Sequence, residues 1–392
     1  MKLIFPDYAK YCIEKLESNR FEAWFVGGCV RDAILERKFG DIDITTNATP
    51  EQIMSVFEHT IPTGIKHGTV TVISEQMPVE ITTYRTESKY TDFRHPENIS
   101  FVDDIKEDLA RRDFTINAMA YNDKDGLKDL FGGLDDLNKK VIKSVGNPHE
   151  RFSEDALRIL RAYRFASVLG FSISDDVKEA SIKLIPLLEN ISGERVLNEL
   201  AKLAKGEYLS VVFDFVNCGG LLNFGINSLN VGVEVLQKLV QSKIESSLKL
   251  PLFISLTDHN TNIIKNRLKP DNKLYTQINL LDRLCNVNPT LEDKISLKKL
   301  LSLYGEDNVK LYLNYLWLVG FEKTDFLLTY YNQIISDFEP YSITHLAIGG
   351  DDLISVGISG RDIGKALEGA LDFVIKHPER NTKNELMTLF KK

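Results

Sequence analysis

The sequence has few cysteines and histidines, and their spacing argues against several classes of protein. Its four cysteines (Cys12, Cys29, Cys218, Cys285) include no C-x-x-C pair, so we expect no disulfide framework and no zinc site, and we predict buried thiols. The seven histidines form neither H-E-x-x-H nor a His-Asp sequence, which leaves a histidine-based metallohydrolase without support. The P-loop pattern G-x-x-x-x-G-K-[ST] is also missing.

Long apolar runs and an excess of positive charge are also missing. No run is long enough for a membrane span, and the N-terminus "MKLIFPDYAKYC" reads as the start of a helix rather than a leader, so we expect a cytoplasmic protein. The net charge of −8 argues against a strongly basic nucleic-acid binder. Residues 238–273 nevertheless carry seven Lys or Arg against three acids, which fits either a solvated surface or a local basic groove.

The patterns that are present divide the 392 residues into two parts. Up to about residue 138, short β patterns alternate with helices: "AWFVGG" and "GDIDIT" read as strands, and "GTVTVI" with "MPVEITTYR" as an antiparallel pair. "TPEQIMSVF" predicts a helix capped by Thr49, with Gln52 at its third position. From about residue 139 the pattern is helical to the end. We therefore predict an α+β head, built on a small mixed or antiparallel sheet, followed by an all-α remainder.

Two aspartates one residue apart are the first candidate site. In a strand, Asp41 and Asp43 face the same side, while Ile42 and Ile44 face the core. Two adjacent carboxylates repel each other unless a cation lies between them, and Mg²⁺ binds one or two carboxylates together with substrate phosphates. A lone D-x-D is more often an exposed strand with two solvated aspartates. The sequence around it decides between these readings.

A glycine pair and an arginine precede the aspartates. Gly27 and Gly28 allow backbone N–H groups to approach an anion, and a helix from about Arg31 would present its N-terminus to phosphate. Together with the D-x-D strand, this layout indicates metal-dependent nucleotidyl transfer. Glu80 in "PVEITTYR" is either a third carboxylate beside the metal or a member of an ordinary ion pair.

A second basic stretch, "EDLARRDFTINAMAYN", places Arg111 and Arg112 ahead of an apolar run. The planar guanidinium group suits a triphosphate or ribose contact because it donates paired hydrogen bonds. Surface salt bridges from this pair to Glu107 and Asp108 are the alternative.

The segment "SEDALRILRAYRFASVLGF" predicts one amphipathic helix capped by Ser153. Its apolar side chains fall on one face, and four charged ones wind across the other: Asp155, Arg158, Arg161 and Arg164. A carboxylate accepts an exocyclic amine proton, and a guanidinium donates to a ring nitrogen or carbonyl. One Asp–Arg pair could therefore read both cytosine and adenine, and would reject uracil and guanine. A solvated helix surface is the alternative.

These motifs resemble a known family. "GGCVRD…DID", "VEITTYR", "RRDFTINAMA", "EDALRILRAYRFA" and "SGERVLNEL" occur in the order found in bacterial tRNA nucleotidyltransferases (CCA-adding enzymes), the class shared with bacterial poly(A) polymerases in the polymerase-beta-like superfamily. They cover roughly residues 20 to 200. The stretch "GGDDLISVGISGRDIGKAL" resembles the C-terminal end of the same family.

The resemblance implies a seahorse-like chain: a catalytic head (1–138), a helical neck that recognises the base (139–205), and a body (206–325) and tail (326–392) that bind tRNA. It implies template-independent addition of C, C and A to tRNA 3′ ends from CTP and ATP, with Mg²⁺ as cofactor and no membrane or obligatory protein partner. By resemblance Asp41 and Asp43 are catalytic and hold the metal. The nucleotide-binding residues would be Gly28, Arg31, Arg112, Asp155, Arg158, Arg161 and Arg164.

Three other functions stay open at this point. Poly(A) polymerases share the head and neck motifs, but they usually carry longer, basic C-terminal regions. Partial enzymes of the family shorten the loop that precedes "RRDFT", whereas "RTESKYTDFRHPENISFVDD" reads as full length. A catalytically silent RNA-binding protein would not need Asp41 and Asp43 intact.

Replacing either aspartate by alanine should abolish transfer of both C and A, because each substitution removes an oxygen ligand of the metal. The measurement is the rate of nucleotide addition to tRNA, with circular dichroism to show that the fold is retained. A folded variant that keeps more than a few per cent of the wild-type rate at normal Mg²⁺ would contradict the two-carboxylate reading.

Overall fold

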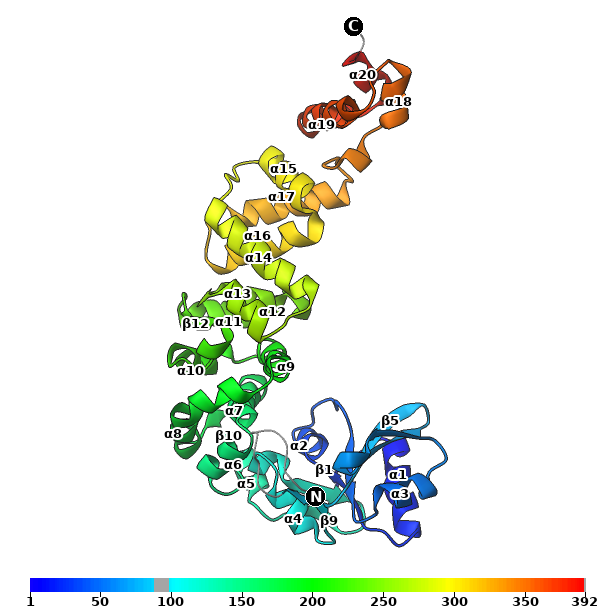
Figure 1. Ribbon diagram of the computed structural model, residues 1–392, viewed down its shortest axis with the longest axis vertical. Helices are drawn as coiled ribbons and strands as arrows, with labels where there is room; N and C mark the ends of the chain where they lie inside the picture. Colours follow the sequence, from blue (N-terminus) through cyan, green and yellow to red (C-terminus); the bar gives the residue numbers. More distant parts are fainter. Residues whose placement is uncertain (88–98, 391–392) are drawn as a thin grey trace. The chain divides into compact units, whose positions relative to one another are not determined.

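The computed structural model describes residues 1–87 and 99–390 (Figure 1). These residues form two compact units, Met1–Leu229 with Asn262–Lys269, and Asn230–Thr261 with Pro270–Lys392. The loop "RTESKYTDFRHPENISFVDD" lies partly outside the described residues, so the prediction that it is full length is not tested. The division into head, neck, body and tail also stays a prediction.

A mixed sheet of seven strands organises the first unit within the described residues, in the order β3-β4-β5-β2-β1-β8-β9. Only the β2–β5 pair is parallel. The strands are β1 (Ala23–Val26), β2 (Asp43–Thr46), β3 (Thr60–Gly64), β4 (Thr69–Ser74), β5 (Met77–Thr83), β8 (Met119–Asn122) and β9 (Gly126–Asp129). The predicted antiparallel pair is confirmed as β4 and β5. The sequence analysis did not predict β3, β8 or β9.

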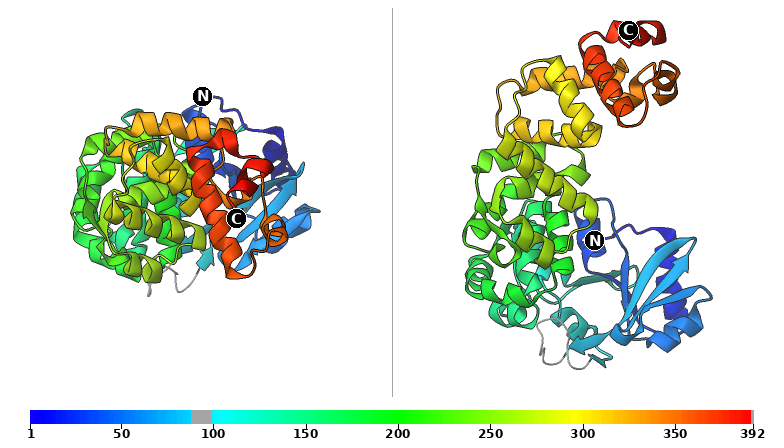
Figure 2. Two further views of the ribbon diagram at one scale, coloured as in Figure 1. Left: turned by 90° about the horizontal axis from the view of Figure 1, so that it is seen from above. Right: turned by 45° about the horizontal axis from the view of Figure 1, so that its top comes forward.

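One side of this sheet is packed against helices. Helices α1 (Asp7–Ser18) and α3 (Pro50–Val56) pack on β4, as Figure 2 shows in dark blue. The inward side chains of the strands, such as Ile44, Val72 and Ile81, are almost completely buried. The predicted cap of α3 is confirmed, because Thr49 and Gln52 form a reciprocal capping box.

The rest of the first unit is mainly helical. Its helices are α2 (Gly28–Ile34), α4 (Ile105–Ala110), α5 (Gly133–Asn138), α6 (Pro148–Glu154), α7 (Leu157–Leu169), α8 (Asp175–Leu184), α9 (Gly193–Leu203), α10 (Phe213–Asn217) and most of α13 (Thr261–Arg267). Two further pairs of short strands lie in this unit: β6 (Arg85–Glu87) pairs with β7 (Ile99–Phe101), and β10 (Val141–Ile142) pairs with β11 (Ser172–Ile173). The second pair interrupts the part of the chain that was predicted to be all helical. The strand β12 (Ile226–Leu229) lies at the end of this unit.

The single helix predicted from Ser153 onward is wrong. The chain breaks at Asp155, which has an extended backbone (φ −138°, ψ 101°), so that α6 ends at Glu154 and α7 begins at Leu157. The side chain of Asp155 accepts a hydrogen bond from the N–H of Leu157, as a capping carboxylate does. Ser153 does not cap α7; its hydroxyl donates to the carbonyl of His149 within α6. Asn147 caps α6 instead.

The second unit is built almost entirely from helices. They are α11 (Val233–Gln241), α12 (Ser246–Ser255), α14 (Asn272–Val287), α15 (Lys294–Tyr304), α16 (Glu306–Leu318), α17 (Thr324–Ser336), α18 (Gly350–Ser355), α19 (Arg361–Lys376) and α20 (Lys383–Thr388), with the short strand β13 (Thr257–His259). The helices pack both on the next helix, as α16 does on α17, and on the next but one, as α14 does on α16 and α15 on α17.

Two expectations from composition concern membrane-spanning helices and buried thiols. Over the described residues, no helix is both long and apolar enough to cross a membrane. All four cysteines are free, but only Cys12 and Cys29 are buried. Cys218 and Cys285 are exposed, so the prediction of buried thiols is wrong for half of them.

Candidate active site

The two central strands of the sheet bring carboxylates together. Parallel pairing of β2 with β5 places Asp43 directly beside Glu80. Asp41 lies just before β2 and is exposed. The pairing with β5 begins one residue later, where the carbonyl of Ile42 accepts a hydrogen bond from the N–H of Glu80 at 3.2 Å. Burial raises the pKa of Asp43 to about 6; Arg112 opposes this shift, and the negative charges of Glu80 and Asp41 add to it.

This arrangement fits a hard divalent cation. The groups that meet here, Asp41, Asp43 and Glu80, carry carboxylate oxygens, which are the ligands that Mg²⁺ prefers. Among the described residues, no group of three His, Cys, Asp or Glu side chains is placed to hold a metal ion. Glu80 therefore lies in register with Asp43 without completing a three-residue ligand set. Two carboxylates are enough where substrate phosphates supply further ligands.

A glycine closes the β1 side of the carboxylates. Gly27 has a φ of 78°, and a Cβ on it would lie 2.9 Å from Nη1 of Arg112 and 3.9 Å from Oδ2 of Asp43. Gly27 thus needs glycine both for its backbone conformation and for the close approach of these two side chains. The sequence-based choice was Gly28, which is the first residue of α2. The helix begins three residues before the predicted start at Arg31.

Arg31 is buried and has protein partners. Its Nε donates to Oδ1 of Asp32 at 2.9 Å, and its Nη1 donates to Oδ1 of Asn117 at 2.7 Å. Its guanidinium carbon lies 5.2 Å from the ring centre of Phe165 on α7. Its Nη2 also donates to Oδ2 of Asp32 at 3.0 Å, and a Cβ on Gly28 would lie 3.6 Å from that nitrogen. In this arrangement Arg31 joins α2 to α7 beside the glycine turn.

The arginine pair after α4 is anchored by a buried carboxylate. Arg111 and Arg112 both bind Asp108, whose side chain is fully buried, with N–O distances of 2.7 and 3.4 Å. Burial alone would raise the pKa of Asp108, but the two guanidinium groups hold it below its usual value. The alternative proposed for this pair, a surface salt bridge to Asp108, is thus correct in naming Asp108 as the partner. It is wrong in placing the salt bridge at the surface, because Asp108 is buried. The same carboxylate accepts the hydroxyl proton of Thr45, which fixes Arg112 over β2.

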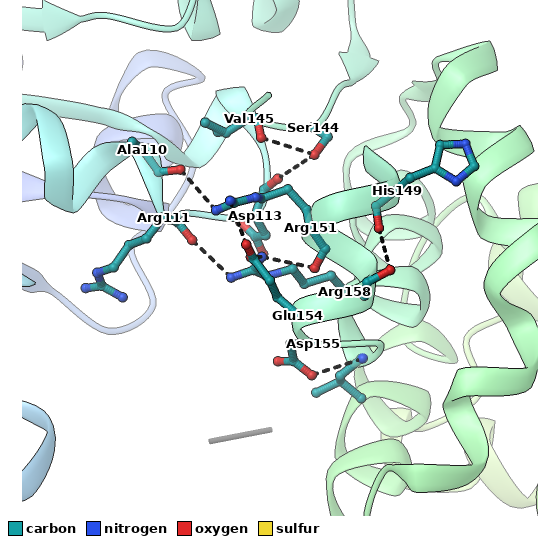
Figure 3. Close-up of polar contacts among 12 residues, drawn as sticks. Ala110, Arg111, Asp113, Ser144, Val145, His149, Arg151, Glu154, Asp155 and Arg158 are labelled. Atoms are coloured by element: carbon teal, nitrogen blue, oxygen red, sulfur yellow. Dashed lines mark hydrogen bonds and ion pairs between the residues drawn. The ribbon is translucent and has the colours of Figure 1, made fainter. Parts of the chain in front are cut away.

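Asp155 and Arg158 are joined through the backbone, where the N–H of Arg158 donates to the carbonyl of Asp155 at 3.0 Å, but their side chains have different partners (Figure 3). Nη1 of Arg158 donates to Oε2 of Glu154 at 2.7 Å and to the carbonyl of Arg151 at 3.1 Å, and its Nη2 donates to the carbonyl of Arg111 at 3.0 Å. Oδ2 of Asp155 instead accepts a hydrogen bond from Nη2 of Arg195 at 2.7 Å. The buried Nη1 of Arg195 has no hydrogen-bond partner within residues 1–87 and 99–390.

The other two arginines of α7 belong to a buried ion network. Nε of Arg161 donates to Oδ2 of Asp113 at 2.7 Å, and Nε of Arg164 donates to Oε2 of Glu199 at 2.8 Å. Nη1 of Arg161 lies 3.5 Å from Glu199, so the four charges alternate in sign. Burial would raise the pKa of Asp113, but Arg161 and Asn117 hold it at about 2. The alternative reading of this helix face, a solvated surface, is therefore wrong for Arg161 and Arg164.

Three residues that hold the site together were given no role from the sequence: Asn117, Arg195 and Glu199. Arg195 and Glu199 are one helical turn apart on α9, within "SGERVLNEL", so that both face α7. One signal in the sequence points to such residues: three arginines on one helix need acidic partners. It does not show which acidic residues those partners are.

The basic segment 238–273 is not a uniform cationic surface. Nη2 of Arg267 donates to the carbonyl of Glu189 at 2.7 Å, and a Cβ on Gly193 would lie 1.7 Å from the carbonyl oxygen of Arg267. Lys249 is buried and donates to the carbonyl of Val240, and Lys238 donates to the carbonyl of Trp317. Several of its cations therefore hold the protein together, which weakens the interpretation of the whole segment as an RNA groove.

Comparison with known proteins adds to this geometry. Residues 23–143 match the family model described as poly A polymerase head domain, and residues 170–215 match the model described as probable RNA and SrmB-binding site of polymerase A. The chain is 38% identical over 380 residues to a CCA-adding enzyme of Lactobacillus delbrueckii subsp. bulgaricus, covering 95% of this chain and 94% of that one. It is 43% identical over 301 residues to a CCA-adding enzyme of Staphylococcus haemolyticus, covering 77% and 74%.

A solved structure is similar over nearly the whole length. The crystal structure of the Bacillus stearothermophilus CCA-adding enzyme in complex with CTP aligns with a TM-score of 0.81 and 26% identity, covering 99% of this chain and 97% of that one.

Removing the central carboxylate of the ion network should cost stability in a pH-dependent way. The pKa of Asp113 falls from 3.8 to about 2 on folding, so its ionised form contributes about 2 kcal/mol at neutral pH. Asp113→Asn should lower the free energy of unfolding by at least that amount at pH 7. Because the folded pKa is depressed, the difference from wild type should shrink as the pH falls from 3.8 toward 2. Urea titrations across this range would refute the assignment if the difference stayed constant.

Proposed function

Because the chain belongs to the family of CCA-adding enzymes, we propose that it adds C, C and A to the 3′ end of tRNA from CTP and ATP, with release of diphosphate. The observation that carries the proposal is the position of Asp43. It lies beside Glu80 on one side and against Gly27 and Arg112 on the other. Carboxylates flanked by a glycine turn and a guanidinium are what a triphosphate and its counter-ion require.

In this proposal the triphosphate lies at the glycine turn. Gly27 and Gly28 leave room for phosphate oxygens near the backbone, and the guanidinium of Arg112 faces the same point. Asp41 and Asp43 would hold Mg²⁺, which supplies charge neutralisation for phosphate oxygens when bound. The 3′-hydroxyl of the RNA forms a bond to the α-phosphorus, and the bond from that phosphorus to the diphosphate breaks. Arg31 acts by fixing α2 to α7 beside the turn.

Base selection is assigned to the start of α7. Asp155 offers a carboxylate, and beside it lies Nη1 of Arg195, which has no partner among the described residues. Arg158 would donate to the base by exchanging one of its present bonds to Glu154 or to the carbonyls of Arg151 and Arg111. Arg161 and Arg164 support this turn through Asp113 and Glu199 rather than by contact with the base. We assign the catalytic head to residues 1–138, the neck to 139–205, and the tRNA-binding body and tail to 206–325 and 326–392. A cytoplasmic location is part of the same proposal.

Poly(A) synthesis is the second candidate, because the family models that match are described by that activity. The relatives that match over almost the full length of both chains favour CCA addition.

The direct test is incubation of the protein with tRNA that ends at the discriminator base. CTP alone should extend the RNA by two nucleotides, ATP alone should leave it unextended, and both together should add three. Product lengths read at single-nucleotide resolution distinguish the alternatives. A long ladder of added A would indicate a poly(A) polymerase. Extension that stops after two nucleotides when both CTP and ATP are present would indicate a partial enzyme. The absence of any product would indicate a catalytically silent protein.

The role of Asp155 can be tested by misincorporation. Asp155→Ala removes the carboxylate that repels the O4 of uracil or the O6 of guanine, so use of UTP or GTP should rise relative to CTP and ATP. A hydrogen bond to a charged group contributes roughly 1.5–3 kcal/mol, which corresponds to about ten- to a hundredfold in discrimination. Asp176→Ala, on α8, is a matched control that should leave the ratio unchanged. If the Asp155 variant slows equally with all four nucleotides, the residue is structural.

A further inference from the structure

We propose that His259 and Asp282 form a pH-sensitive latch on a segment of the chain that leaves the second unit and returns to it. This segment, Asn262–Lys269, belongs to the first unit, whereas the residues on both sides of it belong to the second. We call it the strap. His259 lies on β13, three residues before the strap, and Asp282 lies on α14, which begins three residues after it. The latch therefore joins the two chain segments from which the strap departs and to which it returns.

The ring of His259 faces an acceptor at each of its nitrogens. Nε2 lies 3.0 Å from Oδ1 of Asp282, and Nδ1 lies 2.9 Å from the carbonyl oxygen of Thr257. An ionised carboxylate and a carbonyl have no proton to donate, so a neutral ring would turn one unprotonated nitrogen toward an acceptor. The form that suits both contacts is the doubly protonated, positively charged imidazolium. The side chain of His259 is only 6% exposed, so these partners rather than water stabilise its charge.

The charges nearest to His259 favour the same protonated form. Burial lowers the pKa of His259, but Asp282, the carbonyl of Thr257 and the negative charge of Asp258 together raise it above its ordinary value. Two carboxylates, one on α14 and one on β13 itself, therefore act on the ring in the same direction.

The cations on the neighbouring elements are directed elsewhere. Helix α12 packs on β13 and has one charged residue, Lys249, whose ammonium donates to the carbonyl of Val240. On α14, Arg283 follows Asp282 in the sequence, but its guanidinium lies over the ring of Tyr304. The carboxylate of Asp282 is thus left to pair with the imidazolium.

The raised pKa of His259 determines how the latch responds to pH. An unfolded histidine has a pKa of about 6.5, so below that value the ring is charged in both states and the ion pair contributes fully to stability. As the pH rises through the higher pKa of the folded state, the ring loses its proton and this contribution is lost. The latch is therefore closed at mildly acidic pH and opens as the solution becomes alkaline.

The strap that the latch closes is packed within the first unit. Ile264 and Leu268 on it are completely buried, and a Cβ on Gly193, the first residue of α9, would lie 1.7 Å from the carbonyl oxygen of Arg267. Two residues further along α9, Arg195 binds the carboxylate that is proposed to read the base. Segments of this kind open locally without global unfolding, and an interaction that holds their ends opposes such opening.

Hydrogen exchange of the strap, followed by mass spectrometry in wild type and Asp282→Asn, tests the latch without reference to activity. Exchange rates are measured from pH 5.5 to 9 and divided by the intrinsic rate at each pH. Asp282→Asn keeps the shape of the side chain and removes its charge. At pH 6 the strap should exchange about three- to tenfold faster in the variant, which is the effect of losing one partly exposed ion pair. Above the folded pKa of His259 the two proteins should exchange equally.

Glu379→Gln is the matched control. It removes the carboxylate that lies 3.9 Å from His377, an exposed pair of the same chemistry in the second unit, and it should leave exchange of the strap unchanged at every pH. A strap that exchanges no faster in Asp282→Asn than in Glu379→Gln would overturn the latch. So would a difference between Asp282→Asn and wild type that is the same at pH 6 and pH 9.

An NMR titration of ¹³C-labelled histidine rings measures the ion pair itself and does not depend on opening of the strap. The signal of His259 is identified as the one that is missing from His259→Gln. Its pKa should lie above about 6.5 in wild type and should fall in Asp282→Asn, because the carboxylate that favours the charged ring is gone. A wild-type value at or below 6.5, or one that Asp282→Asn leaves unchanged, would contradict the proposal.

Discussion

The parallel pairing of β2 with β5 is the constraint on which the rest of the site depends. It places Asp43 beside Glu80 in a sheet whose other described strand pairs are antiparallel, with the glycine turn and Arg112 packed on the β1 side of the same carboxylate. Burial, together with the negative charges of Glu80 and Asp41, raises the pKa of Asp43, and Arg112 opposes this shift.

A second set of interactions ties this sheet to the helix that is proposed to read the base. Asn117 binds both Arg31 of α2 and Asp113, and Asp113 binds Arg161 of α7, which in turn neighbours Glu199 of α9. These groups are largely buried, so removing one partner would leave a charge without compensation in a medium where that is costly. The glycine turn and the start of α7 are therefore held in one polar network within the first unit.

The sequence was informative where a local pattern determines structure. The alternation in "GDIDIT" and "MPVEITTYR" predicted which side chains of β2 and β5 face inward and outward. The capping box was predictable because Thr49 and Gln52, which form it, are only three residues apart in the sequence. Long-range choices could not be predicted. Asp155 breaks a helix because its carboxylate caps the next one and binds Arg195, forty residues away. The glycine that has no room for a side chain is Gly27 rather than Gly28, because the guanidinium of Arg112, far away in the sequence, packs against it.

The central claim is that Asp41 and Asp43 hold the metal that accompanies the triphosphate. Anomalous X-ray diffraction from crystals of the protein grown with CTP and Mn²⁺ would test it most directly. The account predicts an anomalous peak in contact with the carboxylates of Asp41 and Asp43 and with phosphate oxygens at the Gly27 turn. A peak bound to other side chains, or CTP seated away from that turn, would contradict the assignment of the active site.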